Sequence, residues 1–440
     1  MSTSSSQLRP PATPTYILRG HAAPIHGLHI FHQNLHIISG DAEGWIIVWD
    51  LVFKRPVAVW KAHEGAILEV KGFNLNGNVT EVYTHGRDHK LRVWKFSVQD
   101  EDILQKTLPV DLADQSHSSS LSQPWLVHSL PVNALNFCAF SMLFVDSLDH
   151  KDDGLESQPQ ESKSPTGDSP PRSSVLIAVP NALDSGAIDL FHLPRERRVC
   201  TIPAGTSHQT GMVMAVNLFF STSGEMHVAS AYEDGHVMVF ARRGRLTAQS
   251  IPENPKNWKW EKLYSCRPHS QPVLSLDVNP TAGYFISSSA DAALVKHPIP
   301  GLGPGSVHAR PEEDPLKTIN TKHAGQQGLR VRSDGKIFAT AGWDSRIRVY
   351  SCKTMKELAV LKWHKEGCYS VAFADVCVTF EDATLNPQKN GTNIDEGQLT
   401  KHVEEPSLAT VHRQRNQKVQ KTHWLAAGSK DGKISLWDIY

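Results

Sequence analysis

The sequence predicts an all-β protein in which one unit is repeated seven times along the chain. Two observations support this prediction. Segments such as 39–50 and 84–94 combine a strand of small residues, a tight turn that holds an acidic residue, and an alternating strand that ends in Trp. Alternation on both sides of a turn is the signature of a β-hairpin. A histidine also precedes the turn acid at a similar distance in most copies, as His63 lies 25 residues before Asp88.

The copies differ in how well they keep this pattern. Three copies keep the terminal Trp, at 39–50, 84–94 and 427–438, and the other four replace or lose it. Phe240 stands at the Trp position of the fourth copy, and Tyr350 stands there in the sixth. The fifth copy ends at His297 and has no Trp, Tyr or Phe at that position. The four weaker copies are 175–191, 230–240, 287–297 and 340–350.

Two polar tracts interrupt the repeat. In the last copy His364 lies 67 residues before Asp431, but 47 of those residues form the tract 375–421, which lacks strand periodicity. Removing the tract restores a spacing of 20 residues. A second tract, 147–174, is rich in Ser, Pro, Asp and Lys. Both are predicted to be disordered surface inserts, and the Ser-rich and Pro-rich segment 1–14 is predicted to be a disordered N-terminus.

The repeat resembles the WD40 family, in which each unit is one four-stranded blade of a β-propeller. The resemblance implies a seven-bladed propeller over residues 15–440. Residues 15–19 look like a strand without a hairpin partner, whereas the chain ends soon after Trp437. We therefore expect this strand to complete the seventh blade and close the ring. The expected blades are 15–60, 61–124, 125–200, 201–264, 265–318, 319–360 and 361–440.

In the WD40 family a His, a Ser or Thr, the turn Asp and the strand Trp form a buried hydrogen-bonded chain within a blade. By resemblance the second copy carries the full structural tetrad His63, Thr84, Asp88 and Trp94. Other copies carry parts of it, with Glu43 in place of Asp in the first copy and Ala427 in place of the hydroxyl in the last. The partial tetrads are His21, Ser39, Glu43 and Trp49; His323, Thr340, Asp344 and Tyr350; and His364, Asp431 and Trp437.

Composition and motifs exclude several classes of function. Lys and Arg number 45 and Asp and Glu number 45, so the net charge is zero and direct binding to nucleic acid or membrane is not expected. The longest apolar stretch, 134–145, is too short to span a bilayer. The six cysteines show no paired spacing and are predicted to be reduced thiols of an intracellular protein. No phosphate-binding loop or nucleophile elbow is present. The histidine pairs His32/His36 and His85/His89 have a zinc-like spacing, but on a strand such side chains lie far apart, so no cofactor, metal or catalytic site is predicted.

The residue just before each turn acid is expected at the rim of the propeller, where partners bind. Among these residues Trp343, Arg87 and Lys430 are the candidate partner-binding residues, with Trp343 as an exposed aromatic anchor. A basic run from Arg413 to Lys421 is interpreted as solvated surface, with nuclear import or a nucleic-acid patch as the alternative. The six rim positions are Ala42, Arg87, Glu233, Ala290, Trp343 and Lys430.

Several strings along the chain are similar to the ASTRA-associated protein 1 family of fungi, whose animal relatives are the G-protein beta-subunit-like proteins. The resemblance implies a non-enzymatic scaffold subunit of the nuclear ASTRA complex, linked to chromatin remodelling. Its implied partners are a PI3-kinase-like protein, the co-chaperones of that protein and AAA+ ATPases. The alternatives are a ubiquitin-ligase substrate receptor or a G-protein-beta-like signalling subunit. The similar strings are 17–21, 61–65, 84–88, 276–280, 325–328, 334–336 and 341–346.

Overall fold

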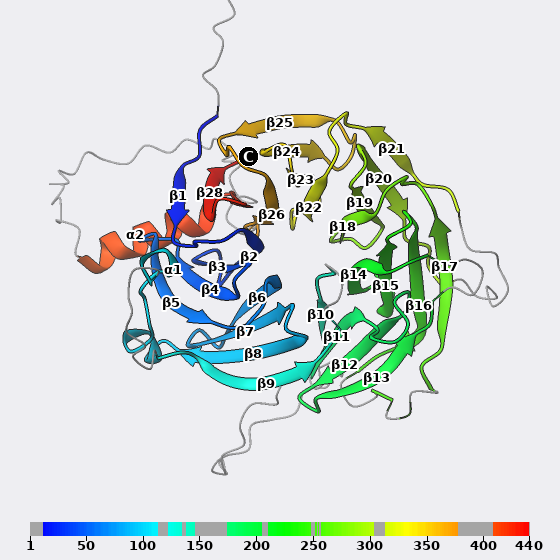
Figure 1. Cartoon of the computed structure of the whole chain (residues 1–440), viewed down its shortest axis with the longest axis horizontal. Coiled ribbons are helices and arrows are strands. Elements are labelled where there is room, and N and C mark those ends of the chain that lie inside the picture. Colours follow the sequence, from blue (N-terminus) through cyan, green and yellow to red (C-terminus); the bar gives the residue numbers. More distant parts are fainter. Residues whose placement is uncertain are drawn as a thin grey trace, which may run out of the picture.

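Seven antiparallel sheets of four strands form a ring, so the protein is a seven-bladed β-propeller, as the repeat predicts (Figure 1). The structure is a computed structural model. The inner strands of neighbouring blades contact one another around the ring, and each sheet runs outward from there. No helix among the described residues is long and apolar enough to cross a membrane. The structure describes residues 12–112, 122–133, 138–145, 174–204, 210–247, 251–252, 254, 257–302, 313–376 and 408–439.

The strands follow one another from the inner to the outer edge of each blade. Blade 1 contains β2 (Ile25–Phe31), β3 (His36–Asp41), β4 (Trp45–Asp50) and β5 (Arg55–Lys61), and blade 2 contains β6 (Ile67–Leu75), β7 (Val79–Gly86), β8 (Lys90–Ser97) and β9 (Trp125–Pro131). Blade 3 contains β10 (Ser141–Val145), β11 (Ser174–Pro180), β12 (Ile188–Leu193) and β13 (Arg197–Ile202). Blade 4 contains β14 (Val213–Phe220), β15 (Glu225–Tyr232), β16 (Val237–Arg245) and β17 (Trp260–Cys266).

The remaining three blades follow the same order. Within the described part of the chain, three helices lie between strands. Blade 5 contains β18 (Val273–Val278), β19 (Tyr284–Ser289), β20 (Ala293–Pro298) and β21 (Lys317–Asn320). Blade 6 contains β22 (Gln326–Val331), β23 (Ile337–Gly342), β24 (Arg346–Ser351) and β25 (Glu357–Lys362). Blade 7 contains β26 (Cys368–Phe373), β27 (Trp424–Ser429), β28 (Lys433–Asp438) and β1 (Tyr16–Arg19). The helices are η1 (Asp100–Asp102), α1 (Pro109–Leu112) and α2 (Leu408–Lys421).

The ring closes through its N-terminal strand. Strand β1 pairs with β28 in antiparallel register, with Tyr16 opposite Leu436 and Arg19 opposite Lys433. Leu18 of this strand is almost fully buried, so the pairing also buries apolar surface. Two strands far apart in the sequence thus form the outer half of blade 7, as predicted from the unmatched strand at 15–19.

Several predicted blade boundaries are wrong: one places a whole strand in the neighbouring blade, and others cut a strand short by two residues. The boundary at residue 124 assigned 125–131 to the third blade, but β9 pairs with β8 and is the outer strand of blade 2, with Trp125 opposite Lys95. Strands β13 and β17 likewise extend two residues past the predicted ends at 200 and 264. Strand β9 is mostly exposed and lacks the apolar alternation that marks a half-buried strand, so the sequence pattern does not place it.

The predicted inserts need correction at their ends. Residue 174 is the first residue of β11, and residues 408–421 form helix α2 rather than disordered chain. The prediction missed this helix because its side chains are mostly polar and only Val419 is buried, which leaves almost no apolar periodicity. Most of the two inserts, 147–173 and 377–407, lies outside the described residues, as do residues 1–11 of the predicted disordered N-terminus.

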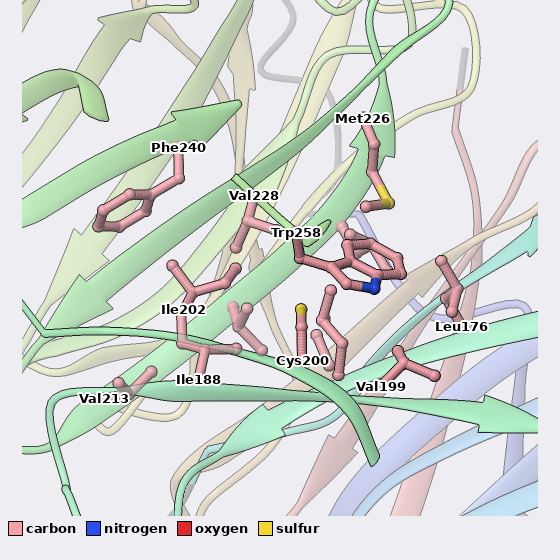
Figure 2. Close-up of a cluster of buried hydrophobic side chains, with 14 of the residues drawn as sticks. Leu176, Ile188, Val199, Cys200, Ile202, Val213, Met226, Val228, Phe240 and Trp258 are labelled. Atoms are coloured by element: carbon pink, nitrogen blue, oxygen red, sulfur yellow. The ribbon is translucent and has the colours of Figure 1, made fainter. Parts of the chain in front are cut away.

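Apolar side chains fill the spaces between adjacent blades. The largest cluster joins blades 3 and 4 and includes Leu176 and Ile188 from one blade and Met226 and Phe240 from the next (Figure 2). Trp258, in the connection before β17, lies among these side chains and is 7% exposed. Burial of this much apolar area between blades is the main force that holds neighbouring sheets together.

Candidate partner-binding surface and the polar chains beneath it

The second blade contains a continuous chain of four side chains. Trp94 Nε1 donates a hydrogen bond to Thr84 Oγ1 at 3.0 Å, and Thr84 Oγ1 lies 2.8 Å from His63 Nε2. His63 Nδ1 lies 2.7 Å from Asp88 Oδ1. These are the four residues of the tetrad inferred from the sequence, and the structure brings all of them together.

The hydrogen bonds of this chain all run in one direction. The indole N–H can only donate, so the Thr84 hydroxyl accepts it and donates to His63 Nε2, and His63 Nδ1–H donates to the carboxylate. Burial lowers the pKa of His63 and outweighs the opposing effect of Asp88, which favours the neutral ring that this direction requires. Burial raises the pKa of Asp88, but the His63 hydrogen bond and Arg92 lower it to about 2.

The first blade carries a second complete chain, with a different acid from the one predicted. His21 Nδ1 lies 2.7 Å from Asp41 Oδ2, and His21 Nε2 lies 2.7 Å from Ser39 Oγ. Trp49 Nε1 donates to Ser39 Oγ at 2.9 Å. The assignment of Glu43 was wrong: Glu43 is exposed, and only its backbone N–H takes part, by donating to Asp41 Oδ1 at 2.9 Å. Asp41 is the last residue of strand β3, whereas Asp88 in blade 2 stands two residues after the end of β7. The acid can therefore stand either at the end of the strand or within the turn that follows it.

The seventh blade obtains its hydroxyl from another strand. Ala427 stands where Ser or Thr was expected, and Ser435 lies directly opposite it on β28. Ser435 Oγ lies 2.8 Å from His364 Nε2 and accepts a hydrogen bond from Trp437 Nε1 at 2.8 Å. The link to Asp431 is longer, with 4.0 Å between His364 Nδ1 and Oδ1.

The sixth blade does not use the predicted histidine. His323 is exposed, and its Nδ1 is 3.8 Å from Asp344 Oδ2, so its assignment to a buried tetrad was wrong. The fully buried Gln326 takes the place of the histidine, because the Thr340 hydroxyl donates to Gln326 Oε1 at 2.6 Å. Tyr350, at the Trp position, stacks on the Phe338 ring with 5.0 Å between centroids.

The sixth blade also holds its turn acid in a different way. Asp344 accepts two hydrogen bonds from the Arg348 guanidinium, at 2.6 and 3.1 Å. This fork of two parallel bonds ties the turn to strand β24, so that the acid does not depend on a histidine.

The fifth blade replaces the indole with an imidazole. Ser287 Oγ lies 2.8 Å from His269 Nε2 and 2.8 Å from His297 Nε2. His269 Nδ1 lies 3.2 Å from Asp291 Oδ1, and the Tyr264 hydroxyl lies 2.9 Å from His297 Nδ1. His297 therefore continues the polar chain where the sequence pattern had lost its aromatic residue.

The six predicted rim residues occupy equivalent positions around one face of the ring. Each donates its backbone N–H to the carbonyl of the residue that immediately precedes the inner strand of its own blade. This repeated bond places the residues together at one end of the inner strands. The bonds run from Ala42 to Pro24, Arg87 to Ala66, Glu233 to Met212, Ala290 to Pro272, Trp343 to Gly325 and Lys430 to Gly367, at 2.8 to 3.0 Å.

Trp343 is the largest side chain at this rim and is 48% exposed. One side of its indole is covered by Gly325, which has a φ of +73° and where an added Cβ would lie 2.1 Å from Trp343 Cε3. Its Nε1 donates to Gln327 Oε1 at 2.7 Å. The ring is thus fixed in orientation from below while a large part of its surface remains open.

The rim surrounds a hollow of about 340 Å³ at the mouth of the central channel. Gln327, which binds Trp343, lines it together with Arg87 and with the stacked rings of His26 and Tyr369, whose centroids are 5.4 Å apart. Lys430 is exposed at the rim of blade 7. An aromatic anchor, two cations and a hollow are therefore brought to one face.

An ion pair crosses the channel below this hollow. Arg330 Nη2, on β22 of blade 6, donates to Glu69 Oε2, on β6 of blade 2, at 2.5 Å. Asp277 of blade 5 accepts the Val331 N–H at 2.7 Å and the Asn217 side-chain amide at 3.2 Å. Burial lowers the pKa of Arg330, but Glu69 and Asp277 outweigh it and raise that pKa, so Arg330 remains charged. Sequence reasoning missed these residues, since each is one polar residue on an otherwise ordinary strand.

The described residues contain no group of three or more His, Cys, Asp or Glu side chains placed to hold a metal ion. The His, hydroxyl and carboxylate groups that resemble catalytic residues lie in buried chains that recur in several blades. A hydrogen-bonded chain of side chains that ends in a buried Trp has no open position for a substrate.

Comparison with known proteins gives one consistent result. Residues 14–437 match the family model described as ASTRA-associated protein 1. A protein of that name from Aspergillus niger is 68% identical over 454 residues, covering 100% of both chains. One from Aspergillus flavus is 67% identical over 439 residues, covering 99% of both chains. One from Schizosaccharomyces pombe is 31% identical over 387 residues, covering 82% of this chain and 93% of its own.

Proposed function

The chain belongs to the ASTRA-associated protein 1 family, and from that premise we propose that it is a non-catalytic scaffold subunit of the ASTRA complex. Its rim, around Trp343, Arg87 and Lys430, binds the partner proteins. The family name of its relatives supports the association with ASTRA, and the geometry of the rim supports the role in binding.

The half-exposed indole of Trp343 carries this proposal. Exposed Trp side chains at the centre of a surface are frequent binding hot spots, because they bury much apolar area and keep a polar group for orientation. Here the backbone of Gly325 and the side chain of Gln327 hold the ring before any partner binds. A preorganised side chain loses little conformational entropy on binding.

The finer parts of the proposal follow from the family resemblance. The partners are a PI3-kinase-like protein, its co-chaperones and AAA+ ATPases, the complex is nuclear, and its work is linked to chromatin remodelling. The polar chains within the blades are structural in this proposal. They stabilise the hairpins that present the rim and perform no chemistry.

The test is Trp343→Ala in the full-length chain, compared with Trp125→Ala, which removes another exposed indole from β9, far from the rim. Proteins that co-purify from cells are identified by mass spectrometry, and thermal melting is measured in parallel. Loss of a central aromatic hot spot typically costs about 2–4 kcal/mol of binding. We therefore expect Trp343→Ala to lose the PI3-kinase-like protein and AAA+ ATPases while melting changes little, and Trp125→Ala to retain them.

Two results would contradict the proposal. If both variants retain all partners, the rim does not bind them. If the wild-type chain instead co-purifies with a ubiquitin ligase or with G-protein subunits, the chain is an adaptor of another complex.

A further inference from the structure

Helix α2 is an addition to the propeller and not a part of any blade. It lies between β26 and β27, and the sheet of blade 7 is complete without it. Figure 1 shows it outside the ring, beside β1 and β28. A helix of 14 residues is marginally stable by itself in water, so contacts with the propeller must hold it.

The C-terminal end of α2 is fixed by polar contacts to blade 1. Asn34 is buried and donates from Nδ2 to the carbonyls of Asp375 and Gln420, at 2.8 and 3.1 Å, while its Oδ1 accepts the Asp375 N–H at 2.9 Å. One amide thus joins the two described ends of the blade 7 insert. His32, Gln33 and Asn34 all have positive φ, between 51° and 66°. The Asn34 amide is thus presented by a turn whose three residues lie in the left-handed region.

Apolar and aromatic contacts fix the orientation of α2 as well. Val419 is buried beside Trp424, whose Nε1 donates to the Val419 carbonyl at 3.1 Å. Nearer the N-terminal end, the His412 ring meets the Phe53 ring of the β4–β5 turn, with 5.6 Å between centroids. These contacts determine which face of the helix is exposed to solvent.

That exposed face is positively charged. The helix contains no Asp or Glu, and Arg413, Arg415, Lys418 and Lys421 are all exposed. Arg415, Lys418 and Lys421 follow one another at three-residue intervals, so like charges are neighbours on the helix surface, an arrangement that destabilises a helix. No ion pair joins these four cations to any described residue. The helix dipole favours Lys418 and Lys421 in the last turn, but it does not account for Arg413 and Arg415, whereas an anionic partner accounts for all four.

We propose that the basic face of α2 is a binding surface for an acidic segment of a partner protein. The surface lies at the end of the strands opposite the rim and is independent of the rim proposal. From Arg415 to Lys421 the helix rises about 9 Å, a distance that about three residues of extended chain cover. A short run of Asp and Glu side chains therefore fits these cations.

An acidic protein segment fits better than nucleic acid. Nucleic-acid surfaces need a positive stripe that continues along the phosphate backbone. Here the positive stripe is interrupted beside the helix, because the Phe53 turn carries both signs: Lys54 Nζ lies 4.8 Å from the centre of the Trp424 ring, and the carboxylates of Asp50 and Glu101 lie close to one another. The whole chain also has no net charge.

The experiment uses the full-length chain and fluorescence anisotropy at low salt. The probes are a labelled peptide of alternating Glu and Ser, its counterpart with Gln in place of Glu, and single-stranded oligothymidine. The test variant is Arg415→Gln, Lys418→Gln and Lys421→Gln together, because Gln retains helix propensity. The matched control replaces Arg245, Lys353 and Lys356, which are exposed on other blades, by Gln.

We expect the acidic peptide to bind the wild-type chain and the control variant alike, and the α2 variant about tenfold more weakly, as the loss of three exposed ion pairs predicts. Circular dichroism and thermal melting should be the same for all three proteins. The proposal is overturned if the α2 variant binds the acidic peptide as the wild type does, or if the control loses as much. It is also overturned if oligothymidine binds more tightly than the peptide and shows the same loss. None of these outcomes depends on Trp343.

Discussion

Blades 1 and 2 and blades 3 and 4 solve the same structural problem in different ways. Each of the first two blades contains a complete chain from a Trp through a hydroxyl and a His to an Asp, with distances of 2.7 to 3.0 Å. In blade 4 the corresponding Ser230 Oγ donates to the Tyr232 hydroxyl at 3.1 Å, and Phe240 stands at the Trp position within β16. Between blades 3 and 4 lies the largest apolar cluster instead.

The difference shows that the polar chain is one means of fixing a blade and not a requirement of the fold. Directional hydrogen bonds fix the turn and the strand relative to each other, whereas apolar packing stabilises a blade through its neighbour. Blades 1 and 2 should therefore respond most to loss of a polar atom, and blades 3 and 4 to loss of apolar volume.

The largest expected effect is Trp258→Ala in the cluster between blades 3 and 4. Removal of this buried indole leaves a cavity and should lower the free energy of unfolding by about 3–5 kcal/mol. Chemical denaturation measures the change, and Trp125→Ala, at 75% exposure, is the control that should change stability by less than about 0.5 kcal/mol. Similar losses in both variants would mean that the cluster does not carry the stability assigned to it.

The second prediction is Thr84→Val in blade 2, which keeps the shape of the side chain and removes its hydroxyl. His63 Nε2 and Trp94 Nε1 both lose their partner, at a cost of about 2–3 kcal/mol, because an unsatisfied buried polar group costs about 1–3 kcal/mol. Ser230→Ala in blade 4 breaks one bond and should cost about 1 kcal/mol. Equal costs by denaturation would show that the complete chain is no stronger than the isolated bond.

The smallest expected effect is on how the stability of blade 7 depends on pH, through the buried ring of His364. Burial lowers the pKa of His364 to about 4, so the unfolded chain binds this proton first, at its ordinary pKa of about 6.5. The stabilising effect of the neutral ring is present above that pH and is lost as the pH falls towards 4. Between pH 7 and pH 5, we expect His364→Gln to lose about 2 kcal/mol less stability than the wild type. Parallel losses in denaturation curves at the two pH values would contradict this.

The same contrast explains what the sequence could predict. The hairpins, the seven blades and the closing strand follow from local signals: turn acids, alternating strands and an unmatched strand at 15–19. The tetrad of blade 2 has its residues at the expected spacing. Asp41 was missed because the acid that bonds to the histidine can stand at the end of the strand as well as in the turn. Ser435 was missed because the hydroxyl can come from the neighbouring strand, opposite Ala427.

Other features could not be derived from local patterns at all. Gln326 replaces His323 through a side-chain amide, which no His-based spacing reveals. Helix α2 depends on the Asn34 amide, which lies more than three hundred residues away along the chain. Contacts of this kind are set by how the ring closes, and closure is a property of all seven blades together.

The Glu69–Arg330 pair gives the two sides of the ring separate surroundings. Both residues line the hollow at the rim and also the second hollow, of about 340 Å³, on the opposite side. The upper hollow is walled by Met214, Leu274 and Tyr369, the lower one by Lys71, Asp277 and Asp375. The pair acts as a floor between two vestibules of different polarity. A group that enters the channel from the rim therefore meets apolar walls above this ion pair, whereas one that enters from the opposite side meets charged walls.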